Sequence, residues 1–365
     1  MVYNVIGLMS GSSLDGLDIV FTTLEEIRGQ WKFDIIECAC IPYKEEMADA
    51  LRNAPDMPLA DFLKLDTAYG RYLGEQINSF IDKYSLQHKV HFIASHGHTV
   101  FHDPASQTTK QIGDGASIAA LTGLPVISDL RNMDIALGGQ GAPIVPIGDK
   151  LLFGSFDYWL NIGGIANMTV KDGDKLFAFD ICPANQPMNA LARREGKEFD
   201  YEGEIAMTGE ILPDVLKALN AEEYYKLDAP KSLSNDYCMQ LAAPVIDSTE
   251  ATNDLLRTTV EMIVTQIAEA IKKYPHGKET ASLLATGGGS LNNFLAEQLR
   301  EKLAPINVNV VVPYEQVANF KEALVMALIG ALRWREETNT LSQATGASRD
   351  SIGGAIWMGH SYNGE

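Results

Sequence analysis

The sequence predicts an α/β protein built from two similar halves. The chain has 365 residues, of which 46% are hydrophobic, and this is enough for more than one core. Segments typical of strands are followed by segments with helical periodicity, and this order occurs twice along the chain. A glycine-rich stretch, ALGGQGAPIVP, separates the two series. Two halves joined in this way predict two domains with a ligand-binding cleft between them.

The elements of the first half follow from periodicity and residue type. Runs rich in β-branched and aromatic residues indicate strands, and apolar residues spaced at i, i+3, i+4 and i+7 indicate helices. The expected strands cover residues 2–9, 16–24, 30–41, 90–95 and 125–130. The expected helices cover residues 44–54, 59–84 and 114–122.

The second half repeats the scheme after the glycine-rich stretch. Strands are expected over residues 157–162, 165–171, 175–181, 282–286 and 308–313, and helices over 250–273, 292–303 and 320–337. The segment after residue 340 is too short for a domain, so we expect it to pack on the first half. The predicted domains are therefore residues 1–127 with 341–365, and residues 128–340.

Charge and hydropathy limit the classes of partner. The formal net charge is −19, which argues against nucleic acid or an anionic membrane as the main partner. No apolar run reaches the roughly 18 residues that a membrane span needs, and the N-terminal residues lack the pattern of a signal peptide. These features favour a cytoplasmic protein. They do not exclude a nucleotide, because backbone N–H groups and Mg²⁺ can hold phosphates without a basic surface.

Three glycine clusters are the strongest indications of a binding site. GLMSGSSLDGLD at residues 7–18 lies between two predicted strands, and NIGGIAN at 161–167 repeats that setting in the second half. ATGGGS at 285–290 ends a strand ahead of a helix. Glycine allows a ligand to approach the backbone, and successive N–H groups bind phosphate. Asp15 and Asp18 could face Mg²⁺ or a substrate hydroxyl group, and a plain hairpin is the alternative for the first cluster.

These clusters and several other segments resemble one family closely. The segments include SHGHTVFH, QIGDGASIAALTG, DLRNMDIALGGQGAPIVP, FDICPANQPMNA, KEALVMALIGAL and ATGASRDSIGG, and with the glycine clusters they run from residue 7 to about 354. The sequence is similar to the 1,6-anhydro-N-acetylmuramic acid kinase family, within the hexokinase, actin and Hsp70 superfamily. The resemblance implies a two-domain actin-like (ribonuclease H-like) ATPase fold with an interdomain cleft.

The resemblance also implies an activity in peptidoglycan recycling. Such kinases are cytoplasmic and use Mg·ATP to phosphorylate O6 of the anhydro sugar while water opens its 1,6-bridge, giving N-acetylmuramic acid 6-phosphate. Asp180 and Glu322 match the catalytic positions, Asp180 as the carboxylate that activates the water and Glu322 as a carboxylate near the sugar. Arg131, His98 and Asn185 match substrate-binding positions. The resemblance leaves the protein ligand of Mg²⁺ unknown and implies a homodimer.

The residues predicted to bind ATP come from the glycine clusters and from the resemblance. They are Gly11, Ser12, Ser13, Leu14, Asp15, Gly16, Leu17, Asp18, Gly163, Gly164, Gly287, Gly288 and Gly289.

Departures from the family pattern keep other functions open. The segment after Asp180 usually reads Asp-Thr-Gly-Pro and here reads DICP, Asn189 replaces a usual aspartate, and His98 a usual glutamine. A non-catalytic ATP-binding sensor, or a kinase for a different amino sugar, therefore stays possible. His96 and His98 have the spacing seen in some metal-dependent hydrolases, which is a further alternative. Cys38 and Cys40 lie two apart in a predicted strand and are expected to be buried thiols rather than a metal pair.

Overall fold

The computed structural model describes residues 1–11, 14–173, 175–229 and 231–359. The chain divides into two units, one formed by residues 1–153 with 320–365 and the other by residues 154–319. We call them unit 1 and unit 2 and describe each by itself. The predicted boundaries at residues 127 and 340 lie inside unit 1 of this division.

Unit 1 is built around a mixed sheet, which has seven strands among the described residues. Its strands lie in the order β12-β6-β4-β1-β2-β3, and β5 pairs with β4. The antiparallel strands β1, β2 and β3 form a meander, whereas β4 is parallel to β1 and β6 is parallel to β4. The bounds are β1 Val2–Ser10, β2 Leu17–Ile27, β3 Gln30–Ile41, β4 Phe92–Asp103, β5 Thr108–Ile112, β6 Val126–Ser128 and β12 Ala355–Trp357.

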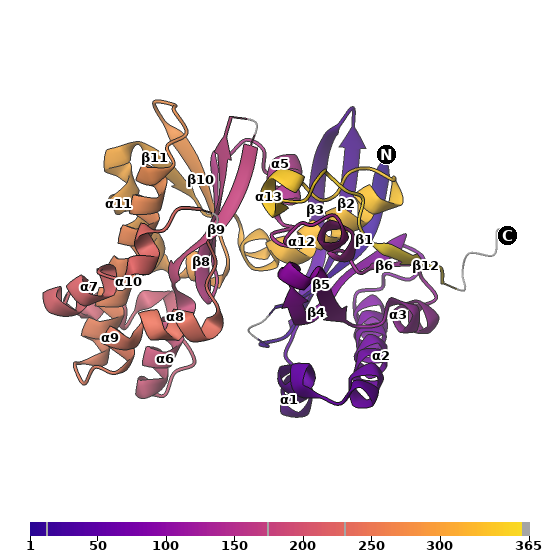
Figure 1. Cartoon of the computed structure of the whole chain (residues 1–365), viewed down its shortest axis with the longest axis horizontal. Helices are drawn as coiled ribbons and strands as arrows, with labels where there is room; N and C mark the ends of the chain where they lie inside the picture. The colour runs from indigo at the N-terminus through magenta and orange to yellow at the C-terminus, as the bar shows by residue number, and fades with distance from the viewer. Residues whose placement is uncertain (12–13, 174, 230, 360–365) are drawn as a thin grey trace. The chain divides into compact units, whose positions relative to one another are not determined.

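Helices cover both faces of this sheet (Figure 1). Side chains of α2 and α3 share a buried core with Ile6 and Leu8 of β1. Gly7 points to the opposite face, because successive strand residues alternate, and there it meets Ala323 of α12. The helices with residues in unit 1 are α1 Glu45–Asn53, α2 Leu59–Lys83, α3 Gly115–Thr122, α4 Asn132–Ala136, α5 Pro146–Leu152, α12 Glu315–Trp334 and α13 Ser342–Thr345.

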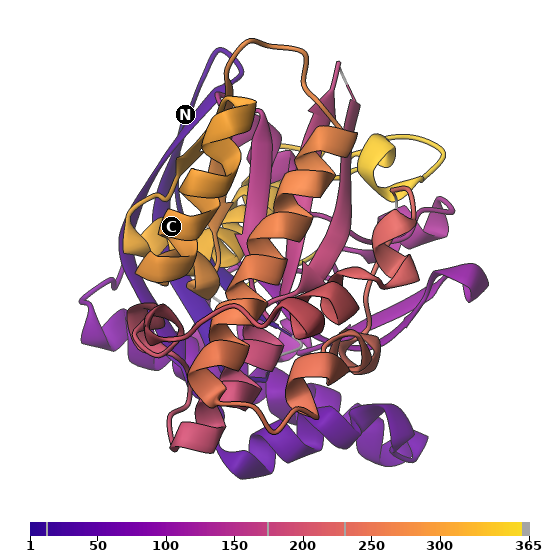
Figure 2. The same ribbon diagram turned by 90° about the vertical axis from the view of Figure 1, so that its left-hand side faces the viewer.

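Unit 2 repeats the same strand order in a sheet of five described strands, β11-β10-β7-β8-β9. The strands β7, β8 and β9 form an antiparallel meander, and β10 is parallel to both β7 and β11. The long helix α10 crosses the sheet beside α11 (Figure 2). The bounds are β7 Tyr158–Ile162, β8 Ile165–Asp172, β9 Lys175–Pro183, β10 Ala281–Thr286, β11 Val308–Val311, α6 Asn185–Ala192, α7 Pro213–Asn220, α8 Asn235–Leu241, α9 Ala243–Ile246, α10 Thr252–Lys273 and α11 Asn293–Leu303.

The repeated strand order confirms the predicted fold class. In each unit the sheet contains a three-stranded meander followed by two parallel strands, which is the ribonuclease H-like arrangement of actin-like proteins. The strands and the long helices lie where periodicity predicts them, within a few residues at most ends. The expected packing of the C-terminal segment is also confirmed, because β12 pairs with β6 in unit 1.

One predicted strand is much longer than expected. The strand at 90–95 was expected to end at the Gly- and His-rich turn, but β4 continues to Asp103. It pairs first with β1 and then, from His98 onward, with β5. Gly97 permits this change of partner, since its φ is +73° and a Cβ there would lie 2.4 Å from the carbonyl oxygen of Ile112. The site residues His96 and His98 thus belong to a continuous strand.

The boundary between the units follows the packing of two segments. The helices α4 and α5 remain with unit 1, where Phe153 packs edge-on against Phe33 of β3. The helix α12 has a break at Phe320 (φ −113°, ψ 16°), and the part after the break packs on β1 and β4 through Gly7 and Gly330. The boundaries expected from sequence, at residues 127 and 340, assign both segments to the second domain.

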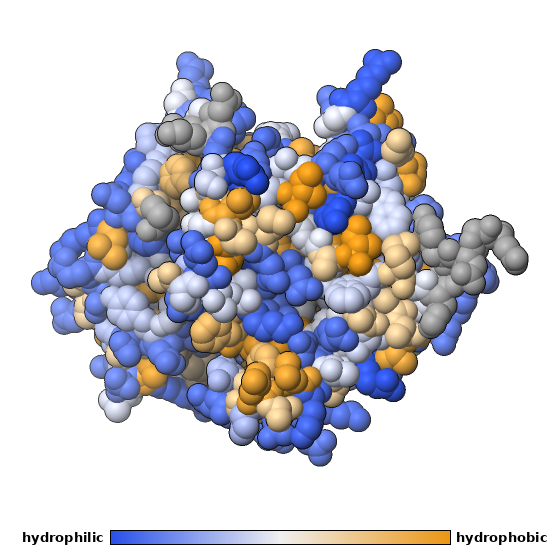
Figure 3. Space-filling view, turned by 45° about the vertical axis from the view of Figure 1, so that its right-hand side comes forward, coloured by the Kyte–Doolittle hydropathy of each residue, from blue (hydrophilic) through white to orange (hydrophobic). Residues whose placement is uncertain are grey.

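Hydrophilic side chains cover most of the face shown in Figure 3, and hydrophobic side chains form only small groups on it. Among the described residues, every helix is too short or too polar to cross a membrane.

Candidate functional site

The loop between β1 and β2 presents backbone and carboxylates. Gly16 approaches β3 so closely that a Cβ would lie 2.7 Å from the carbonyl oxygen of Ile41. Leu14 adopts a left-handed conformation (φ +57°), and its amide donates to the carbonyl of Gly11 at 3.4 Å. Leu17 is buried in the core, so it can offer a ligand only its backbone. Of the predicted phosphate-binding residues, Ser12 and Ser13 lie outside the described residues.

Asp18 lies in an acidic environment at the start of β2. It is paired in register with Cys40 on β3, and the Cys40 thiol donates a hydrogen bond to its carboxylate. Burial, together with the neighbouring carboxylates of Asp15 and Glu322, raises the pKa of Asp18 to about 7. Burial and Asp18 likewise raise the pKa of Cys40 to about 12, so the thiol stays protonated. Cys40 was expected to be a buried thiol, but its residue surface is exposed.

Arg131 is held by its neighbours in unit 1. Its Nε donates to Nε2 of His96 at 2.9 Å, and its Nη1 donates to the carbonyl of Gly141 at 2.6 Å. Gly141 is fixed in turn, because its amide donates to the buried carboxylate of Asp134 at 2.8 Å. Burial lowers the pKa of Arg131 to about 10, and the acidic side chain of Glu322 partly opposes this shift. The guanidinium therefore remains charged at neutral pH.

Glu322 follows the break in α12, so it lies near the start of a helical segment as the sequence predicts. Burial raises the pKa of its carboxyl group, and the cations Lys321 and Arg131 oppose that shift. Lys321 itself forms an ion pair with Asp149 of α5 at 2.6 Å, and both side chains are buried. This ion pair was missed from sequence, because the partners are far apart in the chain.

His98 belongs to a buried chain of hydrogen bonds. Its Nδ1 lies 2.9 Å from Oγ of Ser10, which also accepts from the hydroxyl of Tyr43 at 2.7 Å, and Tyr43 contacts the hydroxyl of Tyr69 at 2.6 Å. Burial lowers the pKa of His98 to about 4, so the imidazole is neutral at physiological pH. The sequence gave no signal for the two tyrosines.

The contacts of His96 do not support the metal-dependent hydrolase. Its Nδ1 lies 2.9 Å from the carbonyl of Gly97, and its Nε2 accepts from Arg131, so both ring nitrogens are engaged. Within the described residues, no group of three or more His, Cys, Asp and Glu side chains is arranged to hold a metal ion.

The two glycine clusters of unit 2 lie against each other. Gly163 and Gly164 form the turn between β7 and β8, and Gly287 follows β10 with φ +82°. A Cβ at Gly287 would lie 2.7 Å from the carbonyl oxygen of Ile162, and one at Gly289 would lie 2.4 Å from the Ile162 side chain. A Cβ at Gly288 would meet little, since its nearest neighbour is Asn185 at 4.0 Å. The backbone around Gly288 is therefore open to a flat ligand.

Asn185 connects these two clusters. Its backbone amide donates to the carbonyl of Gly163 at 3.0 Å, and its Nδ2 donates to the carbonyl of Ile162 at 3.2 Å. A side chain at Gly289 would collide with its Oδ1. Asn185 thus fixes the glycine turns of unit 2.

Asp180 is a half-buried carboxylate on β9. One oxygen, Oδ2, accepts from the amide of Leu233 at 2.8 Å, while Oδ1 has no hydrogen-bond partner among the described residues. Burial raises the pKa of its carboxyl group. The replacements that follow it, Ile181 and Cys182, are buried in the core of unit 2. Their side chains therefore contribute to packing.

The residues of unit 1 fit an oxygen-liganded cation. Asp15 and Asp18 are carboxylates, the ligand type that Mg²⁺ prefers, and Mg²⁺ commonly uses one or two carboxylates together with substrate phosphates. Burial is the main cause of the raised pKa of Asp18, and repulsion from the carboxylates of Asp15 and Glu322 adds to it. A divalent cation would relieve this repulsion.

Comparisons with known proteins identify the family. The family model for anhydro-N-acetylmuramic acid kinase matches residues 3–359. The chain belongs to this family. A protein of Sulfurimonas denitrificans named anhydro-N-acetylmuramic acid kinase is 32% identical to this chain, over 96% of this chain and 98% of the relative. A protein of the same name from a Sulfurovum species is 30% identical over 97% of this chain and 98% of its own length.

The family resemblance stated from the sequence is thereby confirmed. A member of the anhydro-N-acetylmuramic acid kinase family is an ATP-dependent sugar kinase of amino-sugar metabolism. Among solved structures, this chain is similar to the activator of 2-hydroxyisocaproyl-CoA dehydratase from Clostridium difficile with bound ADPNP, with a TM-score of 0.47 and 13% identity. That similarity covers 92% of this chain and 96% of the activator.

Proposed function

We propose that this chain transfers the γ-phosphoryl group of ATP to O6 of 1,6-anhydro-N-acetylmuramic acid while water opens the 1,6-bridge. The product is N-acetylmuramic acid 6-phosphate. Membership of the family supports the substrate class, since both relatives are named for it. The observation that carries the hydrolytic step is Asp180, a desolvated carboxylate with one oxygen held by an amide and the other available.

The proposed reaction couples two bond cleavages. Asp180 accepts a proton from water as the water oxygen bonds to C1 of the sugar, and the C1–O6 bond breaks. The electron pair left on O6 attacks the γ-phosphorus of ATP, and the bond to the β-phosphate oxygen breaks with release of ADP. A raised pKa makes Asp180 a stronger base than an exposed carboxylate.

Other residues serve to bind and orient in this proposal. The loop of residues 11–18 holds the phosphates, and Asp15 and Asp18 hold Mg²⁺, which would neutralise charge on the phosphoryl oxygens. The glycines of unit 2, residues 163–164 and 287–289, receive the nucleoside, with Gly288 as the open position. Asn185 supports those turns, which favours a nucleotide-side role over direct contact with the sugar.

The sugar contacts are assigned to the charged residues of unit 1. The charged Arg131, held by His96 and Gly141, suits the lactyl carboxylate of the sugar. Glu322 suits a sugar hydroxyl group, and the neutral His98 can exchange a hydrogen bond with substrate through its Nε2. A cytoplasmic homodimer remains the prediction from the resemblance.

The mass of the product tests the proposal directly. The protein is incubated with Mg·ATP and anhydro-N-acetylmuramic acid, and the molecular mass of the sugar product is measured by mass spectrometry. Gain of phosphate together with water is the expected result, whereas gain of phosphate alone would show a kinase without ring opening. An unchanged sugar, with ATP binding intact, would favour the non-catalytic sensor, or a different amino sugar as substrate.

A further inference from the structure

Unit 1 contains a pocket that no proposed reactant occupies. Its volume is about 190 Å³, smaller than the roughly 300 Å³ at which pockets for drug-sized ligands begin. It lies beside the middle of β4 and the end of β6, next to the N-terminus of α3 and the strand β12. Its lining consists of Ser95, His96, Gly97, Lys110, Gln111, Gly113, Asp114, Gly115, Ser128, Asp129 and Trp357.

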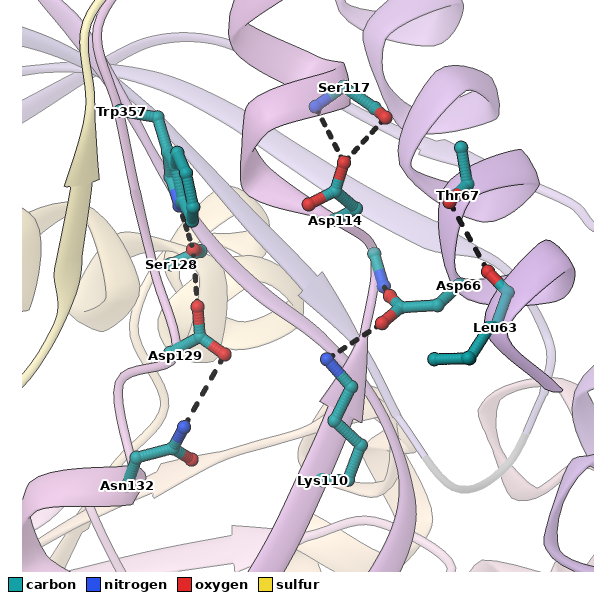
Figure 4. A network of polar contacts seen from close by, with 11 residues as sticks. Leu63, Asp66, Thr67, Lys110, Asp114, Ser117, Ser128, Asp129, Asn132 and Trp357 are labelled. Atoms are coloured by element: carbon teal, nitrogen blue, oxygen red, sulfur yellow. Dashed lines mark hydrogen bonds and ion pairs between the residues drawn. The ribbon is translucent and has the colours of Figure 1, made fainter. Parts of the chain in front are cut away.

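The polar side chains around the pocket are held in place (Figure 4). Asp114 caps α3, accepting from the amide of Ser117 at 2.9 Å and from its hydroxyl at 2.6 Å. On the other side, Nε1 of Trp357 donates to Oγ of Ser128 at 3.1 Å, and Ser128 donates to Asp129 at 2.8 Å. The walls are thus preorganised, which lowers the conformational entropy lost on binding.

Two buried polar atoms at the pocket lack partners. Ser95 is 1% exposed and Gln111 is 6% exposed, yet neither Oγ of Ser95 nor Oε1 of Gln111 has a hydrogen-bond partner within the described part of the chain. A buried polar group without a partner costs about 1–3 kcal/mol. Both residues line the pocket, and a small rotation of either side chain would let a ligand hydroxyl group satisfy its oxygen.

The charge of the lining selects against anions. Asp114 and Asp129 contribute two carboxylates, and the ammonium of Lys110 is already paired with Asp66 at 2.7 Å. Burial lowers the pKa of His96 to about 3, so this side chain adds no positive charge. The available groups are mostly acceptors, which suit O–H and N–H donors and disfavour a phosphate or a carboxylate.

The pocket also adjoins the residue proposed to bind the substrate carboxylate. His96 lines the pocket and accepts from Nε of Arg131, and Asp129 precedes Arg131 by two residues on the same loop. Asp129 has a left-handed conformation (φ +56°), so that the loop turns sharply there. A ligand in the pocket would therefore contact both the residue and the loop that fix Arg131.

We propose that this pocket binds a small, hydroxyl-rich ligand without negative charge, of the class of neutral monosaccharides and their 2-amino derivatives. Such a ligand donates to Ser95, Gln111, Asp114 and Asp129, and its ring lies beside the indole of Trp357. The site is separate from the residues assigned to ATP, Mg²⁺ and the anhydro sugar, and the inference does not rest on the proposed reaction.

Binding of N-acetyl-D-glucosamine and D-glucosamine to the full chain, without ATP, tests this site. Calorimetry should give saturable binding of at least one sugar, with a change in tryptophan fluorescence that Trp357→Phe removes. Ser95→Ala should weaken binding about tenfold, the loss of roughly one hydrogen bond. The same variant should raise the melting temperature, since an unsatisfied buried hydroxyl is removed.

Two further variants distinguish the pocket from the proposed substrate site. Asn adopts the left-handed backbone conformation as readily as Asp, so Asp129→Asn should preserve the loop. It should nevertheless weaken the binding of both sugars. Glu322→Gln should leave it unchanged, because Glu322 does not line the pocket. Absence of saturable binding by either sugar would overturn the proposal. So would equal affinities in wild type, Ser95→Ala and Asp129→Asn, or loss of binding in Glu322→Gln alone.

Discussion

The two units place the same hairpin at the centre of their sheets, but the turns differ in length and charge. In unit 1, residues 11–16 connect β1 to β2, and Asp15 and Asp18 lie in or beside the turn. In unit 2, only Gly163 and Gly164 connect β7 to β8. One strand order therefore carries two kinds of turn, one with carboxylates in unit 1 and one of bare glycine backbone in unit 2, and we propose both as phosphate contacts.

The charged groups that surround the turns extend this difference. Unit 1 gathers Asp18, Glu322 and Arg131, whose pKa values are shifted by burial and by one another. Unit 2 offers Asp180, which has burial and one amide as the causes of its pKa shift. We infer that unit 1 binds the phosphates of ATP and that unit 2 supplies the general base, Asp180.

The largest expected effect comes from removing that base. Asp180→Asn should lower turnover by about 10²–10⁴-fold, the usual contribution of a general base. ATP binding should persist, because the residues proposed to bind the nucleotide lie elsewhere. Steady-state kinetics and ATP calorimetry measure the two effects.

A matched control for this variant is available in unit 2. Asp228 is an exposed carboxylate paired with Lys273 at 2.7 Å, and Asp228→Asn should leave turnover unchanged. Full turnover in Asp180→Asn would contradict the assignment of the general base to unit 2.

A second comparison sets a glycine of unit 1 against one of unit 2. In Gly7→Ala the new Cβ would meet the carbonyl oxygen of Ala323 at 2.1 Å, and such overpacking destabilises by about 1–3 kcal/mol. In Gly163→Ala the nearest atom is 3.5 Å away, so the fold should tolerate the methyl group. Thermal unfolding of both variants measures the contrast, and equal melting temperatures would contradict it.

A third prediction concerns pH and unit 1. The folded-state pKa of Asp18, about 7, lies above the usual value of 3.8, so its protonation stabilises the fold as pH falls through 7. Asp18→Asn should therefore melt higher than wild type at pH 8, and the difference should shrink at pH 6. The affinity of the wild type for Mg·ATP should increase about tenfold from pH 6 to pH 8, because the carboxyl group of Asp18 ionises over this range. If the melting temperatures of the wild type and Asp18→Asn changed in parallel with pH, this prediction would be wrong.

The smallest expected effect belongs to the buried hydroxyl chain. Tyr43→Phe removes the hydrogen bonds to Ser10 and Tyr69 and should cost about 1 kcal/mol in the free energy of unfolding. Tyr72→Phe is the control, because its hydroxyl has no hydrogen bond within the described ranges. Denaturant titration of the two variants should separate them, and matching midpoints would argue that the chain adds no stability.

Local patterns predicted the elements but not their pairing. Sequence patterns could predict the hairpins, the glycine turns and the position of Asp180 on a strand, because each depends on a few consecutive residues. The contact of Asp18 with Cys40 depends on the register of β2 against β3, and the bond from Arg131 to His96 joins positions 35 residues apart. The pocket was missed for the same reason, since Asp114, Asp129 and Trp357 come from three separate elements.

The division of the chain has a consequence for its synthesis. Unit 2 is one continuous segment, whereas unit 1 consists of residues 1–153 and 320–365. A ribosome therefore completes unit 2 before the part of α12 from Phe320 onward and the strand β12 have been made. Throughout that interval Gly7 of β1 lacks the residues of α12, Ala323 and Ala327, that pack on it in the folded chain. Residues 1–153 therefore cannot complete the packing of unit 1 until a segment that follows more than a hundred and sixty residues later has been made.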